Sequence, residues 1–165
     1  MENSLKEKNS YYIEEVIVYP INKKENKVLL IHKKRGLGSG LYNGPGGKVH
    51  KNETAKEAAI RECEEEIGIK PITLNHKATI EFINNKYEKI LVHVFVTYKW
   101  RGKPKETDEA KPIWFDINAL PYQNMWEDDI YWLPYVLKDN EIYAIFEFKK
   151  WKLIRKKVYF LNEVK

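Results

Sequence analysis

The sequence predicts a single α+β domain in which helices flank a largely β body. Runs rich in β-branched and aromatic residues recur along the chain, whereas two stretches have helical character. The 165 residues, 43% of them hydrophobic and 13% aromatic, suit one compact domain with a filled core. No internal repeat, low-complexity tract or linker divides the sequence. We therefore expect one domain over residues 12–165, preceded by a flexible polar segment over residues 1–11.

Strands are expected at both ends of the chain and through its middle. The runs YIEEVIVYPI (12–21) and KVLLIHKK (27–34) flank a short polar break and predict a hairpin. Residues 36–47 are rich in glycine and are expected to form a loop. Further strands are expected at 78–83, 89–100, 112–116, 141–148 and 153–160.

Two helices are expected. The first covers residues 52–67, because Asn52 can cap its start and Gly68 can end it. The second covers residues 127–138, where Pro134 is expected to break or kink it.

The composition excludes some classes of protein. A single cysteine, Cys63, cannot form an internal disulfide, and the first residues do not read as a secretion signal, so we expect a cytoplasmic protein. No apolar run approaches the roughly 20 residues that a membrane helix needs. The chain has 29 Lys and Arg against 24 Asp and Glu, a net charge of +5. Residues 149–165 alone carry +6, which leaves −1 for the rest, so only this basic tail suggests a nucleic-acid partner.

Three carboxylates share one face of the first expected helix. Glu62, Glu65 and Glu66 fall within an arc of about 100°. Like charges at this spacing cost an isolated helix about 0.2–0.5 kcal/mol per pair, so the cluster favours a bound cation such as Mg²⁺ or Mn²⁺. The alternative is an ordinary solvated face. The glycine-rich sequence just before the helix favours the site, because glycine lets backbone groups approach a phosphate or metal.

The residues around this cluster have a defined spacing. Five residues separate Gly47 from Glu53, and seven more separate Glu53 from Arg61-Glu62. Two residues then precede Glu65-Glu66, and one further residue precedes Gly68-Ile69. This pattern resembles the Nudix box of the nucleoside diphosphate-linked-X hydrolases. It departs only at Cys63, where the family usually has a bulky aliphatic residue; a buried free thiol behaves as a small hydrophobe.

The resemblance implies an α/β/α sandwich with a mixed sheet and attack by water on a diphosphate linkage. By position, Glu62, Glu65 and Glu66 look like metal ligands, with the Gly46 carbonyl as a further one. Which glutamate acts as the general base stays open. The remaining pair of the box, Glu53 and Arg61, looks like the one that holds the helix and its carboxylates in place.

Outside the box the chain resembles one subfamily, the oxidised purine nucleoside triphosphate hydrolases of the 8-oxo-dGTP diphosphatase type. The matching stretches are KKRGLGSGLYNGPGGKV (33–49), VHVF (92–95), DEAKPIWF (108–115) and MWEDDIYWLP (125–134). The resemblance implies that Trp126 stacks on the purine and that Asn43, Asp128 and Asp129 contact its edge. It also makes Glu109 an additional metal ligand.

Several of these residues keep a second interpretation. Lys33 is expected to offset phosphate charge, or to be a solvated strand-end residue. Trp126 can be a stacking residue or plain core, and Phe82 is a candidate pocket wall. Two adjacent carboxyls in a partly buried pocket do not both ionise easily, so Asp128 and Asp129 are expected to share a proton. Glu14 or Glu15 of the first strand is also a candidate to face the base.

Three functions follow, in decreasing order of support. The first is cation-dependent hydrolysis of oxidised purine nucleoside triphosphates such as 8-oxo-dGTP to monophosphate and pyrophosphate. The second keeps the chemistry but acts on another nucleoside diphosphate derivative or on the triphosphate end of RNA, which the basic tail favours. The third is a non-catalytic nucleic-acid-binding module, for which an intact carboxylate triad has no use. We expect a monomer.

Overall fold

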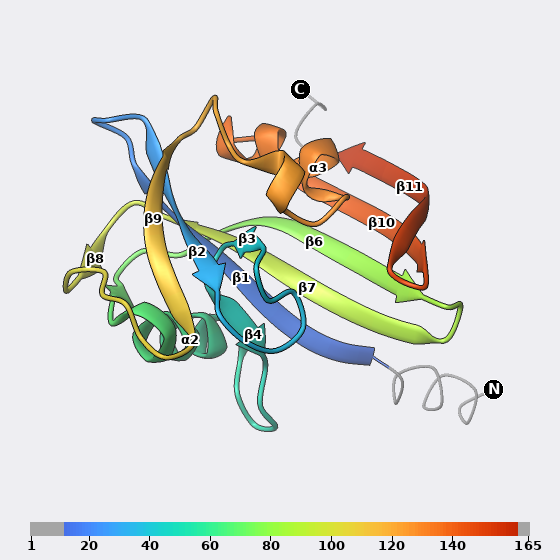
Figure 1. The fold of residues 1–165 in the computed structure, drawn as a ribbon, viewed down its shortest axis with the longest axis horizontal. Coiled ribbons are helices and arrows are strands. Elements are labelled where there is room, and N and C mark those ends of the chain that lie inside the picture. The colour runs from blue at the N-terminus through green and yellow to red at the C-terminus, as the bar shows by residue number, and fades with distance from the viewer. Residues whose placement is uncertain (1–11, 162–165) are drawn as a thin grey trace.

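A computed structural model describes residues 12–161 of the protein (Figure 1). The predicted flexible segment 1–11 lies outside the described residues. The helices are α2 (Ala55–Ile67), the 3₁₀ turn η1 (Tyr122–Asn124) and α3 (Asp129–Leu137). The longer strands are β1 (Tyr12–Asn22), β2 (Lys27–Lys33), β6 (Asn75–Asn84), β7 (Glu88–Thr97), β9 (Ala110–Asp116), β10 (Ile142–Lys149) and β11 (Lys152–Phe160). Four short strands are β3 (Tyr42–Asn43), β4 (Gly46–Lys48), β5 (Lys70–Pro71) and β8 (Trp100–Arg101).

One mixed sheet forms the centre of the molecule. Its strand order is β11-β10-β6-β7-β1-β2-β3, with β4 beside β1 and β9 beside β2. The pairs β1–β7 and β6–β10 are parallel, whereas their neighbours are antiparallel. The predicted mixed sheet is therefore confirmed. A separate two-stranded ladder joins β5 to β8.

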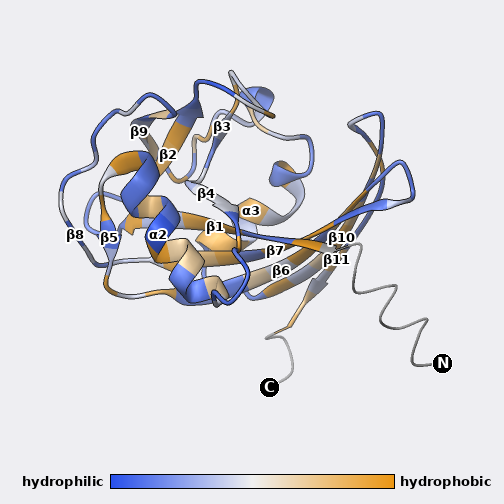
Figure 2. Ribbon diagram, turned by 90° about the horizontal axis from the view of Figure 1, so that it is seen from below, coloured by the Kyte–Doolittle hydropathy of each residue, from blue (hydrophilic) through white to orange (hydrophobic). Residues whose placement is uncertain are grey.

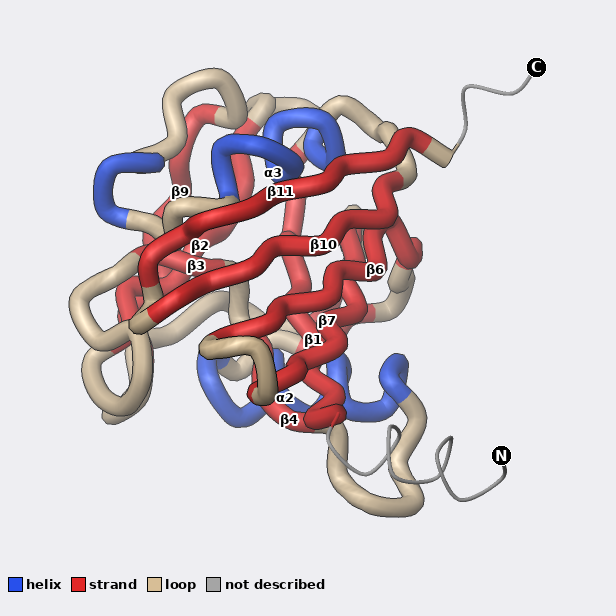
Figure 3. Tube along the Cα trace, turned by 90° about the vertical axis from the view of Figure 1, so that its right-hand side faces the viewer, coloured by secondary structure: helices blue, strands red, loops and turns tan. Residues whose placement is uncertain are grey.

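The two helices cover opposite faces of this sheet (Figure 3). Alternation along β1 divides the core: Val16 and Val18 pack with the apolar stripe of α2, whereas Tyr19 and Ile21 pack with α3. Apolar residues concentrate along the strands and polar ones in the loops (Figure 2). The arrangement is the predicted α/β/α sandwich.

Helix α2 starts later than predicted. Thr54, not Asn52, is the N-cap: its side chain accepts from the Glu57 backbone N–H, and the Glu57 side chain accepts from the Thr54 N–H. This reciprocal capping box satisfies two helix-end donors, whereas Asn52 lies in the preceding turn with φ of 68°. The predicted end at Gly68 is confirmed, because Gly68 adopts the left-handed conformation there.

The N-terminal hairpin and the glycine-rich loop differ from expectation. β1 meets β2 only at its end, through the pairs Ile21 with Val28 and Asn22 with Lys27. The rest of β1 pairs with β7 and β4 instead. The predicted loop 36–47 contains β3 and the start of β4, because its later residues find partners on β2 and β1. Short runs rich in glycine give little sign of such pairing.

The other boundaries agree more closely. The predicted strand 89–100 ends at Thr97, after which the chain crosses over to form β8 against β5. The second helix forms with Pro134 inside it, and the proline does not end it. Both C-terminal strands are confirmed.

The basic tail is largely the strand β11 at one end of the sheet order. Lys152, Arg155, Lys156 and Lys157 are exposed along it. Charged residues on an edge strand discourage pairing with another sheet. Within residues 12–161 no helix is long and apolar enough to cross a membrane.

Candidate active site

A continuous cleft brings together most of the predicted site residues. It consists of two adjoining cavities of about 450 and 350 Å³. Glu15 and Ile17 of β1 and Lys33 of β2 line both cavities, so these are halves of one cleft. We call the larger cavity the aromatic half and the smaller one the acidic half.

Helix α2 supplies carboxylates to the acidic half. Glu62 and Glu66 line it, together with Glu109 from the segment before β9. The backbone of Gly47 allows Glu62 to approach, because a Cβ atom on Gly47 would lie 2.5 Å from Glu62 Oε1. The backbone N–H of Gly46 donates to Glu66 Oε1 at 2.9 Å. Gly46 and Gly47 of β4 therefore meet Glu66 and Glu62 of α2.

Burial alters the acidity of these carboxyls. It raises the pKa of Glu66 to about 8, assisted by the nearby charges of Glu62 and Glu109 and opposed by the Gly46 N–H. Burial also raises the pKa of Glu62, against the effect of Arg61. A cation in the acidic half would offset this burial penalty by favouring the charged forms.

Arg61 holds this face of α2 in place. Its Nε donates to Glu53 Oε2 at 2.8 Å and its Nη2 to Glu53 Oε1 at 3.0 Å, a two-point contact. It also donates to the Lys48 carbonyl at 2.9 Å and to Glu62 Oε1 at 2.8 Å. The Arg61 hydrogen bonds and the His50 N–H lower the pKa of Glu53 to about 2. The predicted positioning role of Glu53 and Arg61 agrees with these contacts.

Glu65 lies apart from the other predicted ligands. Its side chain is 57% exposed, contacts Arg61 Nη1 at 3.3 Å and is not part of the cavity lining. Across residues 12–161 no three His, Cys, Asp or Glu side chains are gathered closely enough to hold a metal ion. The donor chemistry nevertheless fits a hard divalent cation, because the carboxylates of Glu62, Glu66 and Glu109 line one cavity together with Gly46 and Gly47.

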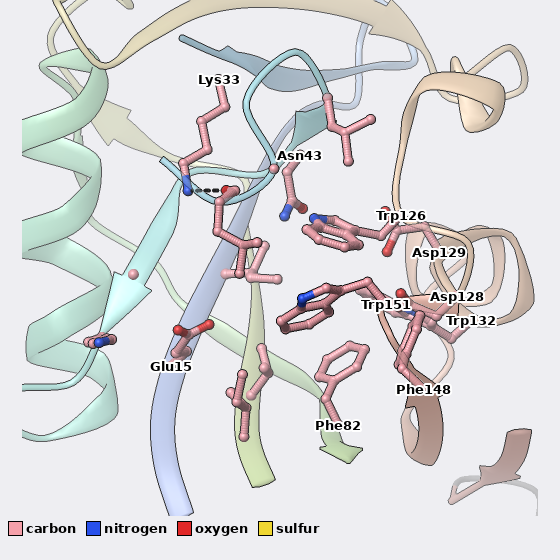
Figure 4. Close-up of a pocket in the computed structure, with 18 residues that line it drawn as sticks. Glu15, Lys33, Asn43, Phe82, Trp126, Asp128, Asp129, Trp132, Phe148 and Trp151 are labelled. Carbon is pink, nitrogen blue, oxygen red and sulfur yellow. Dashed lines mark hydrogen bonds between the residues drawn. The ribbon is translucent and has the colours of Figure 1, made fainter. Parts of the chain in front are cut away.

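The aromatic half contains the residues predicted to bind a base (Figure 4). Trp126 follows η1, and its indole rests on the backbone of Gly38: a Cβ atom there would lie 3.2 Å from Trp126 Cζ2. Gly38 also has φ of 83°, so both the backbone conformation and the nearby indole favour glycine at this position. Phe82 of β6 lines the same cavity. Trp126 is therefore part of the pocket wall. Trp132 also lines the cavity, but it is fully buried and belongs to the core.

Asn43 presents one of its two functional groups to the cleft. Its Oδ1 accepts from the Tyr19 hydroxyl at 3.2 Å and from the Gly44 N–H at 2.9 Å. With the oxygen held by two donors, the Nδ2 amide is the group available to a ligand. Asn43 is thus oriented as a donor.

Asp128 and Asp129 are buried together at the start of α3, 2% and 3% exposed. Trp132 Nε1 donates to Asp128 Oδ2 at 2.8 Å, whereas Asp129 Oδ2 is buried without a hydrogen-bond partner. Burial raises the pKa of Asp128 to about 6. Burial and then the neighbouring Asp128 charge raise the pKa of Asp129 well above its ordinary value. Burial thus favours retention of a proton by the pair, and its sharing between Asp128 and Asp129 stays a prediction.

Some lining residues were not singled out from the sequence. Phe148 of β10 and Trp151 of the β10–β11 turn also line the aromatic half, and the Trp151 indole lies beside that of Trp126 (Figure 4). Glu15, one of two candidates on the first strand, lines both halves. Lys33 lies between the halves, its Nζ donating to the Leu37 carbonyl at 2.7 Å.

Comparison with known proteins identifies the family to which this fold and cleft belong. The NUDIX domain model matches residues 12–136. The chain belongs to the NUDIX family. Members of this family generally use divalent cations, which agrees with the donors of the acidic half.

Three relatives illustrate the likeness. The oxidized purine nucleoside triphosphate hydrolase of Danio rerio is 43% identical over 124 residues, or 74% of this chain and 80% of the relative. The protein of the same description from Mus musculus is 40% identical over 126 residues, with the same coverage. The crystal structure of a mutator MutT protein from Bacillus halodurans covers 88% of this chain and 97% of its own, with a TM-score of 0.78 and 22% identity. The predicted family and fold are confirmed.

Proposed function

We propose that this Nudix protein hydrolyses oxidised purine nucleoside triphosphates, such as 8-oxo-dGTP, to the monophosphate and pyrophosphate, and thereby cleans the nucleotide pool. The observation that carries the proposal is the continuous cleft. Its aromatic half has the size and polarity for a purine, and it joins directly to the acidic half, which holds residues of the Nudix box. The relatives described as oxidized purine nucleoside triphosphate hydrolases support the same substrate class.

The base is recognised in the aromatic half. The indole of Trp126 stacks on one purine face, a contact worth about 1–3 kcal/mol per base in comparable proteins. Stacking tolerates any base, so the edge contacts must discriminate. Asn43 supplies an amide donor, and the Asp128–Asp129 pair supplies a carboxylate acceptor together with a donor on whichever carboxyl keeps a proton. This mixed set suits the keto and N–H groups of an oxidised purine.

The triphosphate then extends into the acidic half, past Lys33, whose ammonium group offsets phosphate charge. A divalent cation, Mg²⁺ or Mn²⁺, would be held by Glu62, Glu66 and Glu109 with the Gly46 carbonyl; Glu65 joins them if its contact with Arg61 breaks. When bound, such a cation polarises phosphoryl oxygens and lowers the pKa of a coordinated water. A carboxylate of α2 takes the proton from the attacking water, while Arg61 and Glu53 keep the helix face in position.

A turnover panel tests the substrate. Pyrophosphate release is measured from 8-oxo-dGTP, 2-oxo-dATP, dGTP and ATP with and without Mg²⁺. We expect higher kcat/KM for the oxidised nucleotides and no turnover without a divalent cation. Equal efficiency on dGTP and 8-oxo-dGTP would refute the substrate assignment.

A matched pair of variants tests the role of Glu65. Glu65→Gln is expected to abolish turnover with little loss of fold, because a neutral amide is a poor ligand for a hard cation. Glu64→Gln, its exposed neighbour, should leave turnover unchanged. If the two variants behave alike, Glu65 is a surface residue.

The exposed basic residues of β11 favour one second candidate, hydrolysis at the triphosphate end of RNA. Its test is pyrophosphate release from triphosphorylated RNA in the same panel, together with a salt titration of RNA affinity. Greater efficiency on RNA than on every free nucleotide would favour this candidate. Affinity that does not fall with salt would show that the lysines of β11 make no phosphate contacts.

A further inference from the structure

The turn between β10 and β11 has an unusual composition. Its two central residues, Lys150 and Trp151, have φ of 49° and 63°, so both are in the left-handed region. Two-residue hairpin turns of this kind favour Asn-Gly, because a side chain with a Cβ atom is disfavoured at positive φ. A bulky tryptophan is especially unfavourable there. The local backbone preference therefore does not account for Trp151.

Hydrogen bonds from the neighbouring hairpin hold this turn in place. Asn85 Oδ1 accepts from the Lys150 N–H at 2.9 Å, and Asn84 Oδ1 accepts from the Trp151 N–H at 3.3 Å. The Asn85 N–H donates in turn to the Phe148 carbonyl at 2.9 Å. All three bonds use backbone groups of the turn and its strand. The turn is thus fixed without help from the Trp151 side chain.

The indole of Trp151 projects into the aromatic half of the cleft (Figure 4). Its ring centroid lies 5.7 Å from that of Trp126, with 51° between the planes. Trp151 is 39% exposed, so part of its surface has no protein contact. The two indoles are thus neighbours inclined to each other, and Trp151 stands at the tip of a hairpin.

We infer that Trp151 is the second aromatic face of the base-binding pocket and closes on the purine from the side opposite Trp126. The inference rests on the proposed function, since it requires a purine ligand. Non-bonded carbon atoms pack about 3.5–4.0 Å apart, so a base between two indoles needs about 7–8 Å between their planes. The two indoles must therefore separate and become parallel, and the exposed side of Trp151 leaves room for that movement.

The strained turn fits this role. Unfavourable backbone conformations persist at ligand clamps where the surrounding structure fixes them. Here the anchored turn holds the Trp151 Cα over the cleft, and only the side chain has to move. A stacked indole grips any base equally, so Trp151 contributes affinity, while Asn43, Asp128 and Asp129 provide the discrimination.

The test compares Trp151→Gly with Trp151→Phe and with Lys150→Gly. Both glycine variants relieve the positive φ in the same turn and keep its backbone hydrogen bonds, but only the first removes the indole. We expect Trp151→Gly to raise KM for 8-oxo-dGTP and for dGTP by a similar factor, about tenfold, with kcat within about twofold of the wild type. Trp151→Phe should recover most of the affinity. Lys150→Gly should leave KM unchanged and raise Tm by about 2 °C.

Product binding separates this inference from the proposed function. Calorimetric Kd values of 8-oxo-dGMP, dGMP and AMP are measured for each variant, which requires no turnover. Suppose that the wild type does not hydrolyse oxidised triphosphates but binds some purine monophosphate about tenfold more tightly than Trp151→Gly does. This result would refute the proposed function and support the clamp. An unchanged or lowered KM and Kd in Trp151→Gly would overturn the clamp alone. A wild-type protein that binds no purine nucleotide would overturn both.

Discussion

Replacement of Asp128 by asparagine should stabilise the protein at alkaline pH and not at acid pH. Burial raises the pKa of Asp128 from the ordinary 3.8 to about 6. The folded state therefore binds the proton more tightly than the unfolded state, and the protein loses stability as pH rises from about 4 to above 6. The rise corresponds to about 3 kcal/mol of unfavourable free energy once Asp128 is ionised in both states.

An asparagine side chain at this position would keep an acceptor for Trp132 Nε1 and carry no charge. We therefore compare the free energies of unfolding of Asp128→Asn and the wild type. The advantage of the variant should be larger at pH 8 than at pH 4 by up to about 3 kcal/mol, or roughly 6–12 °C in Tm. Removing the Asp128 charge also lowers the pKa of Asp129, which acts in the same direction.

Urea unfolding of both proteins at a series of pH values between 4 and 8 measures this effect. Taking the difference between variant and wild type removes the contribution of every group that titrates alike in both. A difference that stays constant over the whole range would refute the argument that burial holds a proton on this pair. Turnover provides a second readout: if Asp128→Asn leaves the ratio of 8-oxo-dGTP to dGTP hydrolysis unchanged, the shared proton has no part in base recognition.

Two further predictions concern helix α2. Thr54→Ala should lower the free energy of unfolding by about 1 kcal/mol, because the side-chain cap of the Glu57 N–H is lost; Thr54→Ser, which keeps the hydroxyl, is the control in urea unfolding. Gly47→Ala should reduce kcat at least about tenfold, because its Cβ atom would displace Glu62, and the double variant with Glu62→Gln should lose no more than Glu62→Gln alone. Additive losses would show that Gly47 acts through another residue.

The acidic half of the cleft was largely predictable because its residues lie close together in sequence. Helical periodicity places Glu62 and Glu66 on one face, and the same short motif carries Gly47, Glu53 and Arg61. The cap of the helix was predicted wrongly at Asn52, because the reciprocal bonds between Thr54 and Glu57 cap the helix better than a single side chain. Glu65 contacts Arg61 and lies outside the cavity lining, although helical periodicity places it on the same face as Glu62 and Glu66.

The aromatic half was less predictable, since its walls come from distant segments. Phe82 and Phe148 meet because β6 and β10 pair in parallel, a connection that leaves no local signal in either strand. Trp151 lies in a turn where the sequence Lys-Trp gives no sign of positive φ. Only the resemblance to relatives predicted a base-binding role for Trp126, Asn43, Asp128 and Asp129. Their spacing in the sequence fits core or surface residues equally well.

Strand β1 is a rigid element that lines both halves of the cleft. It is paired through its backbone with β7 on one side and with β4 on the other, and its Glu15 and Ile17 face both cavities. A slip of one residue would turn these side chains towards α2, so the register is strongly specified. The boundary between the two cavities along β1 is therefore set by the sheet. Such a rigid boundary favours elongated ligands that extend along β1 from one cavity into the other.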